Sequence, residues 1–158
     1  MDPAIVAYLM KKLDLDRNGI DTYMNKKSGM LGISGVSSDF RDLGEAAKQG
    51  NKRAAIALET FAYKVKKYIG AYAAALNGVD AIVFTAGVGE NDRAMRANIM
   101  KDMEYLGVVF DEDYNMSCPR GSEQVISKPE SRVKVIVIPT DEEMMIAKDT
   151  ANIVRSYN

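Results

Sequence analysis

The sequence contains no histidine and no tryptophan, and Cys118 is its one cysteine. Without histidine, this chain cannot supply a Ser-His or Cys-His catalytic pair, a histidine general base or an imidazole metal ligand. A single cysteine excludes an internal disulfide framework and is typical of a reducing compartment. Any chemistry must therefore use carboxylates, arginines, lysines, backbone amides or a hard metal ion.

The sequence also has little excess charge and no long apolar run. Its 158 residues carry 21 Lys and Arg against 22 Asp and Glu, so nothing indicates a nucleic-acid-binding or membrane-binding surface. No stretch approaches the ~20 apolar residues of a membrane span. The acidic N-terminal stretch "MDPAIVAYLMKKLDLD" does not have the pattern of a signal peptide. We expect a cytoplasmic protein with no nucleic-acid and no membrane partner.

Apolar periodicity predicts the fold class. Residues 51–77 repeat apolar positions every three or four residues, which predicts one long amphipathic helix. Near-continuous apolar runs at 81–84 and 133–138 predict buried strands, and each leads through a short turn into a helical pattern. This repetition indicates an α/β protein with a parallel or mixed sheet and flanking helices.

The other segments are less regular. We expect an N-terminal helix capped by Asp2 and a short helix after Ser38. For the rest we expect a short helix at 22–27, a loop with at most a short strand or turn at 27–39, a helix at 92–106, and a polar, turn-rich excursion at 108–131.

The turn after the first predicted strand, "TAGVGEN" at 85–91, is a candidate ligand contact. Ligands bind at the carboxyl edge of open α/β sheets, and helix N-termini attract phosphate. The turn nevertheless matches neither the G-x-G-x-x-G pattern nor the P-loop, and Glu90 would repel an anion. Its glycines suit the flat face of a base or ribose better, with Asn91 available for hydrogen bonds. A purely structural strand-to-helix corner is the alternative.

The turn after the second predicted strand is "PTDEE" at 139–143. Thr140 and Glu143 have the spacing of a capping box, which would engage Glu143. Asp141 and Glu142 are explained less well by capping, and a carboxylate at the end of a buried strand can hold Mg²⁺ directly or through water. The alternative is that the acidic residues only complement the helix dipole.

Two further polar stretches have a local explanation beside a functional one. Arg41 in "SDFRD" stands between Asp39 and Asp42 and suits a nucleotide or a carboxylate, and the alternative is a local ion pair that stabilises the next turn. "DLDRNGIDTYMN", which begins at Asp14, imitates a calcium loop, but Asn25 stands where the loop needs a bidentate carboxylate. A solvated connection between helices is the competing interpretation of that stretch.

Three longer stretches resemble one family when they are taken together. "NKKSGMLGISGVSSDFRDL", "ALETFAYKVKKYIGAYAAALNGVDAIVFTAGVGEN" and "VIPTDEEMMIAKDT" look like the C-terminal part of acetate kinases, in the same order and at similar intervals. The resemblance covers almost the whole chain. It implies an ATP- and Mg²⁺-dependent phosphotransferase that converts acetate reversibly to acetyl phosphate. It also implies the actin-like ATPase fold of the sugar kinase and heat-shock ATPase superfamily.

The resemblance assigns roles to particular positions. Glu142 matches the magnesium-associated glutamate of the family, and Ala86 stands where many relatives have glycine. The positions that match nucleotide-binding residues are Asp39, Phe40, Arg41, Gly87, Val88, Gly89, Glu90 and Asn91. No position of this chain matches a catalytic residue of the family.

The resemblance also implies that groups needed for turnover lie upstream of this chain. Family members are more than twice as long, so we expect residues 1–158 to form a single C-terminal nucleotide-binding domain that is inactive alone. The family forms dimers through this domain, so a homodimer is expected. A propionate or butyrate kinase fragment, or a non-catalytic binding or dimerising module, is the alternative.

Overall fold

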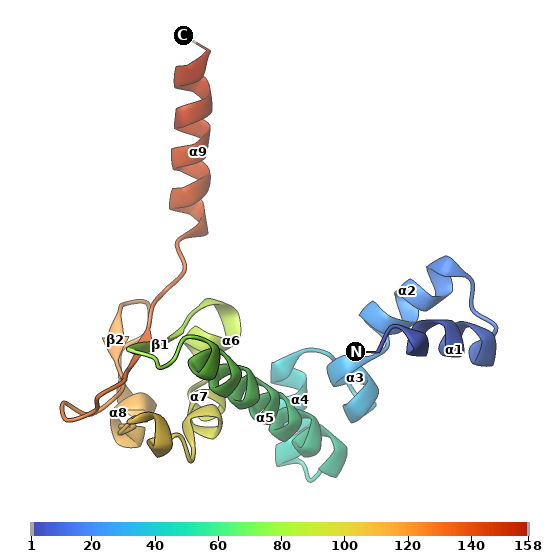
Figure 1. Ribbon diagram of the computed structural model, residues 1–158, viewed down its shortest axis with the longest axis horizontal. Helices are drawn as coiled ribbons and strands as arrows, with labels where there is room; N and C mark the ends of the chain where they lie inside the picture. The colour runs from blue at the N-terminus through green and yellow to red at the C-terminus, as the bar shows by residue number, and fades with distance from the viewer. Residues whose placement is uncertain (1, 158) are drawn as a thin grey trace. The chain divides into compact units, whose positions relative to one another are not determined.

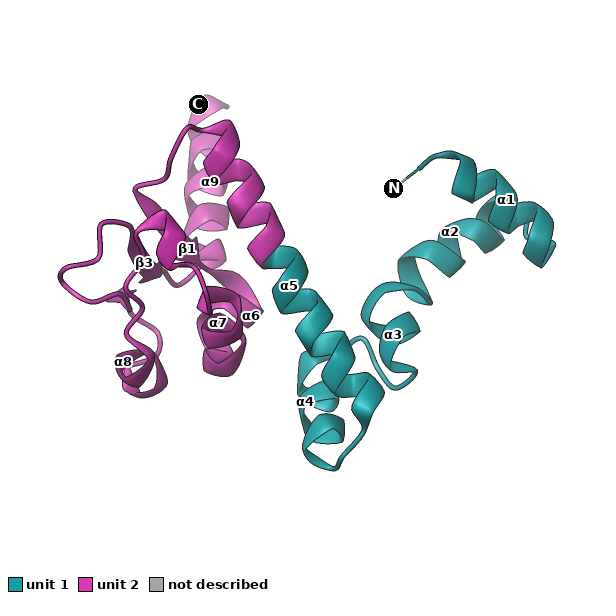
Figure 2. Ribbon diagram, turned by 60° about the horizontal axis from the view of Figure 1, so that its bottom comes forward, with its two compact units in different colours: residues 1–65 teal, residues 66–158 magenta. Residues whose placement is uncertain are grey.

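The computed structural model describes residues 2–157 and divides into two units, Met1–Val65 and Lys66–Asn158, which Figure 2 colours separately. Helix α5 (Lys52–Ala75) contributes its first part to unit 1 and its last part to unit 2, and this matches the long helix predicted over 51–77. The division does not decide whether the whole chain acts as one nucleotide-binding domain, which stays a prediction.

Unit 1 is built from helices. Before α5 its elements are α1 (Ala4–Leu13), α2 (Arg17–Lys26), α3 (Gly29–Ser34) and α4 (Phe40–Lys48). The carboxylates of Asp2, Asp16 and Asp39 each accept a hydrogen bond from a backbone N–H of the helix that follows, at 2.9, 2.7 and 2.8 Å. These caps satisfy N–H groups that a helix leaves unpaired at its start.

Helix α3 lies within 27–39, where the sequence predicts a loop, so that prediction is wrong. Arg53, on α5, donates hydrogen bonds to the carbonyl oxygens of Ile33 at 2.9 Å and Gly32 at 3.1 Å. These carbonyls lie near the end of α3, where a helix leaves its acceptors unpaired. A partner 20 residues away in the sequence thus stabilises a helix that its own glycines disfavour.

Two helix starts in unit 1 also differ from the predicted ones. Helix α2 begins at Arg17, well before the predicted 22–27, because Asp16 caps it. Helix α4 begins after Asp39, whereas the sequence suggests Ser38 as the cap. In both helices an aspartate carboxylate accepts the capping hydrogen bond.

Unit 2 contains the sheet, which consists of β1 (Ala81–Phe84), β3 (Lys134–Val137) and β2 (Gln124–Val125) in that spatial order. Figure 1 labels β1 and β2. β1 and β3 are parallel, and their register places Phe84 opposite Val137. β2 pairs with β3 in the antiparallel direction. The prediction of an α/β chain with a mixed sheet is confirmed.

One face of this sheet belongs to the core of unit 2. Its buried side chains are Ile82 and Phe84 from β1 and Val135 and Val137 from β3. Helix α7 (Arg93–Met100) buries a further set, Met95, Arg96, Ile99 and Met100. Alternation in the strands and three-to-four spacing in the helix thus produce buried faces of the kind that their sequence patterns predict.

The helix predicted over 92–106 is shorter than expected. α7 ends at Met100, Asp102 has a φ of 57°, and a separate 3₁₀ turn, η1 (Glu104–Leu106), follows. Met103 is nevertheless fully buried. The apolar spacing of Met103 therefore predicts its burial correctly, but it does not predict that α7 ends at Met100.

Residues 108–131 contain more regular structure than the predicted turn-rich excursion. Helix α8 (Glu112–Ser117) begins after Asp111, whose carboxylate accepts a hydrogen bond from the Tyr114 N–H at 2.9 Å. The two residues of β2 also lie there, and so short a strand leaves no readable alternation.

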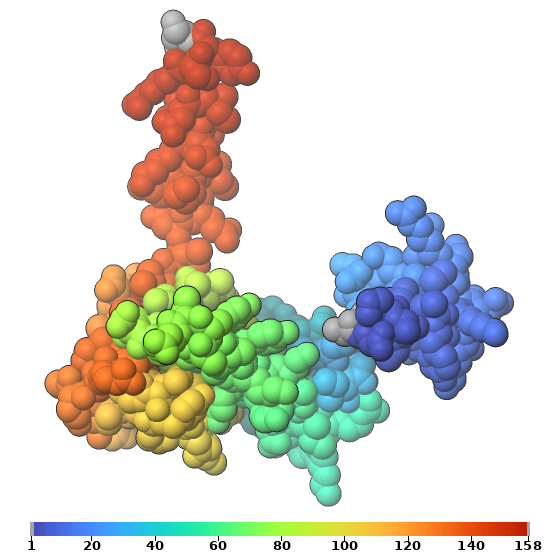
Figure 3. Space-filling view, in the orientation of Figure 1, coloured from blue at the N-terminus to red at the C-terminus, as the bar shows by residue number. Residues whose placement is uncertain are grey.

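The last helix, α9 (Glu142–Ser156), is exposed along its whole length (Figure 3). Its exposed side chains include large apolar ones such as Ile146 and Ile153, at 66% and 57%. Within residues 2–157, no helix combines the length and the apolar character that a bilayer crossing requires.

Candidate functional site

Two turns of unit 2 begin at the same edge of the sheet. β1 leads into helix α6 (Ala86–Asn91), and β3 leads through residues 138–141 into α9. The strands are parallel and in register up to Phe84 and Val137, and the Ile138 N–H donates to the Phe84 carbonyl at 2.9 Å. The carboxyl edge, where open α/β sheets bind ligands, therefore carries both "TAGVGEN" and "PTDEE".

Glu90 connects these two turns. Its Oε1 accepts hydrogen bonds from the backbone N–H of Thr140 at 2.9 Å and from the Thr140 hydroxyl at 2.5 Å. These bonds to the ionised form hold the pKa of the Glu90 carboxyl below its usual value. The carboxylate thus has a protein partner across the sheet edge.

The same contact overturns the predicted capping box. The Thr140 hydroxyl donates to Glu90, and the N-cap of α9 is Asp141, whose carboxylate accepts from the Met144 N–H at 2.9 Å. Asp141 is therefore explained by capping, whereas Glu142 and Glu143 are both exposed residues of the first turn. Capping no longer distinguishes the two glutamates, and the choice of Glu142 depends on the family resemblance.

The glycines of "TAGVGEN" have different structural requirements. A Cβ on Gly89 would lie 3.2 Å from the carbonyl carbon of Phe84, so the close approach of α6 to β1 explains that glycine. A Cβ on Gly87 would meet no atom within 4 Å. Ala86 has a φ of 57°, in the left-handed region that favours glycine. The turn that the sequence describes as a loop is thus a short helix with a strained first residue.

The remaining residues of the turn are partly accessible. Asn91 is exposed, and its Nδ2 donates to the Gly87 carbonyl at 3.0 Å. Val88 is half-buried. The amide of Asn91 therefore supports the turn in this structure, and its exposed position leaves it accessible to a ligand.

Arg96 is a member of this site that the sequence analysis did not identify. It is 1% exposed, and its Nη1 donates to the carbonyl oxygens of Gly89 at 2.8 Å and Glu90 at 2.7 Å. Its Nε donates to Oδ1 of the fully buried Asn115 at 2.8 Å. Burial lowers the pKa of Arg96. The sequence does contain a signal for this residue, because Arg96 is a charged residue on the apolar face that Met95 and Ile99 define.

The other predicted nucleotide-binding residues lie in unit 1. Arg41 donates from Nε and Nη2 to the two carboxylate oxygens of Asp39, at 3.2 and 2.9 Å, and its side chain is 89% exposed. This pairing lowers the pKa of Asp39 to about 2. Phe40 packs edge-to-face on Phe61, with ring centroids 4.7 Å apart. The local ion pair considered for Arg41 is therefore formed.

Carboxylates suited to a metal are sparse in this chain. Among residues 2–157, no group of three or more His, Cys, Asp or Glu side chains could hold a metal ion. An exposed Glu142 still fits Mg²⁺, because this ion commonly uses one or two carboxylates and completes its shell with water and substrate phosphates. The calcium-loop interpretation fails, because Asp16 caps α2 and the stretch continues as helix.

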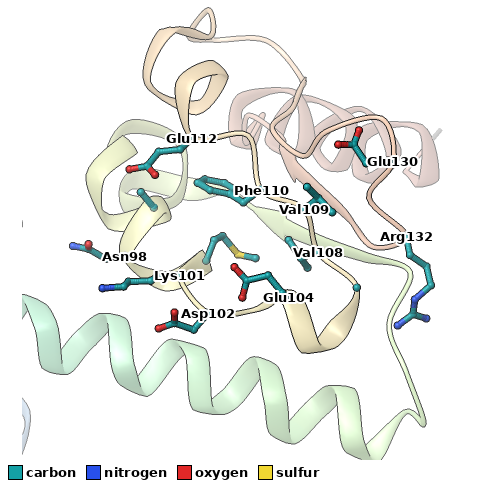
Figure 4. A pocket seen from close by; sticks show the side chains of 13 residues that line it. Asn98, Lys101, Asp102, Glu104, Val108, Val109, Phe110, Glu112, Glu130 and Arg132 are labelled. Carbon is teal, nitrogen blue, oxygen red and sulfur yellow. The ribbon is translucent and has the colours of Figure 1, made fainter.

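Unit 2 also contains an open groove of about 850 Å³, which Figure 4 shows. It is lined by apolar residues such as Val108 and Phe110 and by charged residues of both signs, including Lys101 and Glu104. No residue of α6 and none of 139–142 lines it. The groove is therefore separate from the two turns at the sheet edge.

Known proteins are similar to this chain in sequence and fold. The profile of the acetokinase family matches residues 1–148. The acetate kinase of Caldicellulosiruptor bescii is 55% identical over 150 residues, which are 95% of this chain and 38% of that protein. The crystal structure of Porphyromonas gingivalis acetate kinase has a TM-score of 0.89 and 54% identity, covering 98% of this chain and 38% of that one. A propionate kinase structure from Francisella tularensis subsp. tularensis has a TM-score of 0.81 and 37% identity, covering 93% and 37%. The chain thus spans about two fifths of the length of these relatives.

Proposed function

Because this chain belongs to the acetokinase family, we propose that it forms the nucleotide-binding part of a kinase that transfers a phosphoryl group between ATP and acetate. The transfer is reversible and yields acetyl phosphate and ADP. Its α/β fold is the actin-like ATPase fold of the acetate kinases that it resembles. ATP or ADP is thus the ligand that this chain itself would bind.

The observation that carries the proposal is that the packing of this chain does not explain a glycine at position 87. Packing favours glycine at position 89, where a Cβ would lie 3.2 Å from the Phe84 carbonyl carbon, but no atom lies within 4 Å of a Cβ placed on Gly87. Gly87 is also exposed and does not have a left-handed φ. The fold thus gives no reason for glycine there, whereas the close approach of a flat base or a ribose to the backbone does.

The proposed roles follow from where each group lies. The backbone of Gly87–Asn91 and the side chain of Asn91 would contact the adenosine. A role of Asp39–Arg41 in nucleotide binding is proposed from the family resemblance alone. Glu90 would contribute its backbone, because its carboxylate is occupied by Thr140. This assignment leaves Glu90 in the site without placing its negative charge against a phosphate.

Glu142 would hold Mg²⁺, directly or through water, from the first turn of α9. Mg²⁺ bound with the nucleotide would neutralise phosphate charge. The residues of this chain would then orient the nucleotide for in-line transfer, because phosphoryl transfer depends mainly on positioning and electrostatic stabilisation. We propose no catalytic acid, base or nucleophile on this chain, and we expect the chain alone to form no acetyl phosphate.

A homodimer in the cytoplasm completes the proposal. Tyr68 and Tyr72 on the unit 2 part of α5 and Leu76 just after its end are spaced by four residues and are 58%, 64% and 73% exposed. A stripe of large exposed apolar side chains suits a protein–protein contact. Sedimentation equilibrium should show a dimer, and Tyr72→Lys should dissociate it. A wild-type monomer would contradict this part of the proposal.

A propionate kinase is the second candidate. The solved propionate kinase with a TM-score of 0.81 supports it, because the same fold carries a different acyl substrate there. A butyrate kinase is a further variant of the same chemistry. Coupled assays of the complete protein with acetate, propionate and butyrate should give the highest kcat/KM for acetate, and a higher value for either of the others would reassign the substrate.

Ligand-dependent unfolding tests the proposed nucleotide binding. MgADP at a hundred times its Kd should stabilise the wild-type chain by about 2.7 kcal/mol, with smaller effects of Mg²⁺ or Ca²⁺ alone. Gly87→Ala should weaken the MgADP effect without lowering the stability of the free chain, because its Cβ enters open space. Stabilisation by Ca²⁺ alone, or an unchanged MgADP effect in Gly87→Ala, would contradict the proposal.

A further inference from the structure

Arg96 is a buried cation beneath the proposed nucleotide turn. Among residues 2–157, no carboxylate oxygen lies within 4.0 Å of its guanidinium. Its guanidinium instead meets oxygens of neutral groups, which are two backbone carbonyls and one side-chain amide. A buried charge is costly unless hydrogen bonds compensate it, so these contacts decide whether the arginine is tolerated there.

The two carbonyls belong to Gly89 and Glu90, which are consecutive residues of the turn that we assign to the nucleotide. One nitrogen, Nη1, donates to both at 2.8 and 2.7 Å, which are lengths typical of charge-assisted bonds. These bonds fix the orientation of both peptide groups from the inner side of α6. The outer side of α6, where Gly87 meets open space, stays available.

The guanidinium is itself fixed by Asn115. Nε of Arg96 donates to Asn115 Oδ1 at 2.8 Å, and Asn115 Nδ2 donates to the Arg93 carbonyl at 3.0 Å. Asn115 is fully buried on α8. The side chain of Arg96 therefore contacts the turn at one end of the guanidinium and a rigid core residue at the other.

We propose that Arg96 is a positioning residue for nucleotide binding, because its bonds to the Gly89 and Glu90 carbonyls hold the backbone of 87–91 in the conformation that the adenosine contacts. The inference depends on the proposed function for its ligand, although not for the geometry of the turn. Arg96 acts through the turn and does not touch the nucleotide. Only a planar, multiply donating side chain can reach two carbonyls and an amide at once, so lysine is not an equivalent replacement.

Arg93 provides a matched control on the same helix. It also donates to two backbone carbonyls, those of Met116 and Cys118, at 2.7 and 2.5 Å. These carbonyls belong to the end of α8 and its cap, not to α6. Arg93→Lys and Arg96→Lys therefore remove comparable bonds from the same helix but release different segments.

The test compares Arg96→Lys and Arg93→Lys in the 158-residue chain by amide hydrogen exchange and by calorimetric titration with MgADP. We expect Arg96→Lys to accelerate exchange in 86–92 and to weaken MgADP binding about tenfold, which corresponds to ~1.4 kcal/mol. We expect Arg93→Lys to accelerate exchange in 116–119 and to leave MgADP affinity unchanged. Arg96→Met serves as a second variant, with the same expected pattern and a larger loss of affinity.

A merely structural role for Arg96 predicts a different pattern. Arg96→Lys and Arg93→Lys would then reduce the melting temperature and the affinity to similar extents, and this result would overturn the inference. Slow exchange of 86–92 in Arg96→Lys would overturn it as well. If wild-type chain binds no MgADP, the proposed function fails, and exchange in 86–92 then decides whether Arg96 holds the turn.

Discussion

Replacing Asn115 with alanine removes both hydrogen bonds of a fully buried amide. One bond accepts from the Arg96 guanidinium at 2.8 Å, and the other donates to the Arg93 carbonyl at 3.0 Å. A bond to a charged group contributes about 1.5–3 kcal/mol and a neutral bond about 1 kcal/mol. The expected loss for Asn115→Ala is therefore about 2.5–4 kcal/mol of unfolding free energy.

The assay must follow unit 2 separately, because a chain with two units need not unfold in one step. Native-state hydrogen exchange of the α7 amides in increasing urea gives the free energy of opening for this part. Asn98→Ala is the matched control, since Asn98 is an exposed asparagine on α7. This replacement should change the free energy of opening by less than about 0.5 kcal/mol.

Asn115→Asp separates the two bonds. It keeps an acceptor for Arg96 and adds a negative charge beside it, but it loses the donor to the Arg93 carbonyl. The expected loss is about 1 kcal/mol, smaller than that of the alanine variant. A loss below about 1 kcal/mol for Asn115→Ala would refute the reasoning, because the buried amide would then contribute no more than an exposed one.

Three further predictions concern the two predicted nucleotide-binding segments. Ala86→Gly should stabilise the chain by about 0.5–1 kcal/mol in urea unfolding, because the residue has a φ of 57°; a loss of stability would contradict the left-handed backbone. Gly89→Ala should destabilise unit 2 by about 1–3 kcal/mol in exchange measurements, because its Cβ would lie 3.2 Å from the backbone of Phe84; a neutral effect would exclude that close approach. The carboxyl of Asp39 should titrate by NMR near its pKa of about 2. Its contribution to stability is therefore present above its ordinary pKa of 3.8 and disappears as the pH falls through about 2. Arg41→Ala should return the pKa toward 3.8, and an unchanged midpoint would exclude the ion pair as the cause.

The sequence predicts the parts of the fold that have long, regular patterns. Helix α5 and strands β1 and β3 lie close to their predicted ranges, because burial on one face imposes a period that is visible over many residues. The placement of both candidate turns at one sheet edge also follows from the sequence, since it needs only two parallel strands with their carboxyl ends together.

The missed features depend on partners that are distant in the sequence. Helix α3 is supported by Arg53, and Thr140 is taken out of its predicted capping box by Glu90, 50 residues earlier. Local spacing contains no information on either contact. Helix α7 ends at Met100 although Met103 is still buried, so burial and helical geometry separate there.

The candidate site shows the same limit. Gly87 and Gly89 look equivalent in the sequence, and only the position of the Phe84 backbone shows that a Cβ would be crowded at 89 and not at 87. The sequence places Arg96 on the apolar face of α7, but only the structure shows its bonds to the Gly89 and Glu90 carbonyls. The sequence therefore identifies which residue types are present in the candidate site, but it does not show the structural role of each one.

The most direct test of nucleotide binding at the sheet edge is an NMR titration of the ¹⁵N-labelled chain with MgADP. The account predicts saturable shifts that are largest for the amides of 87–91, with smaller ones around Glu142. Absence of saturable shifts, or shifts confined to the groove residues of 97–132, would contradict it.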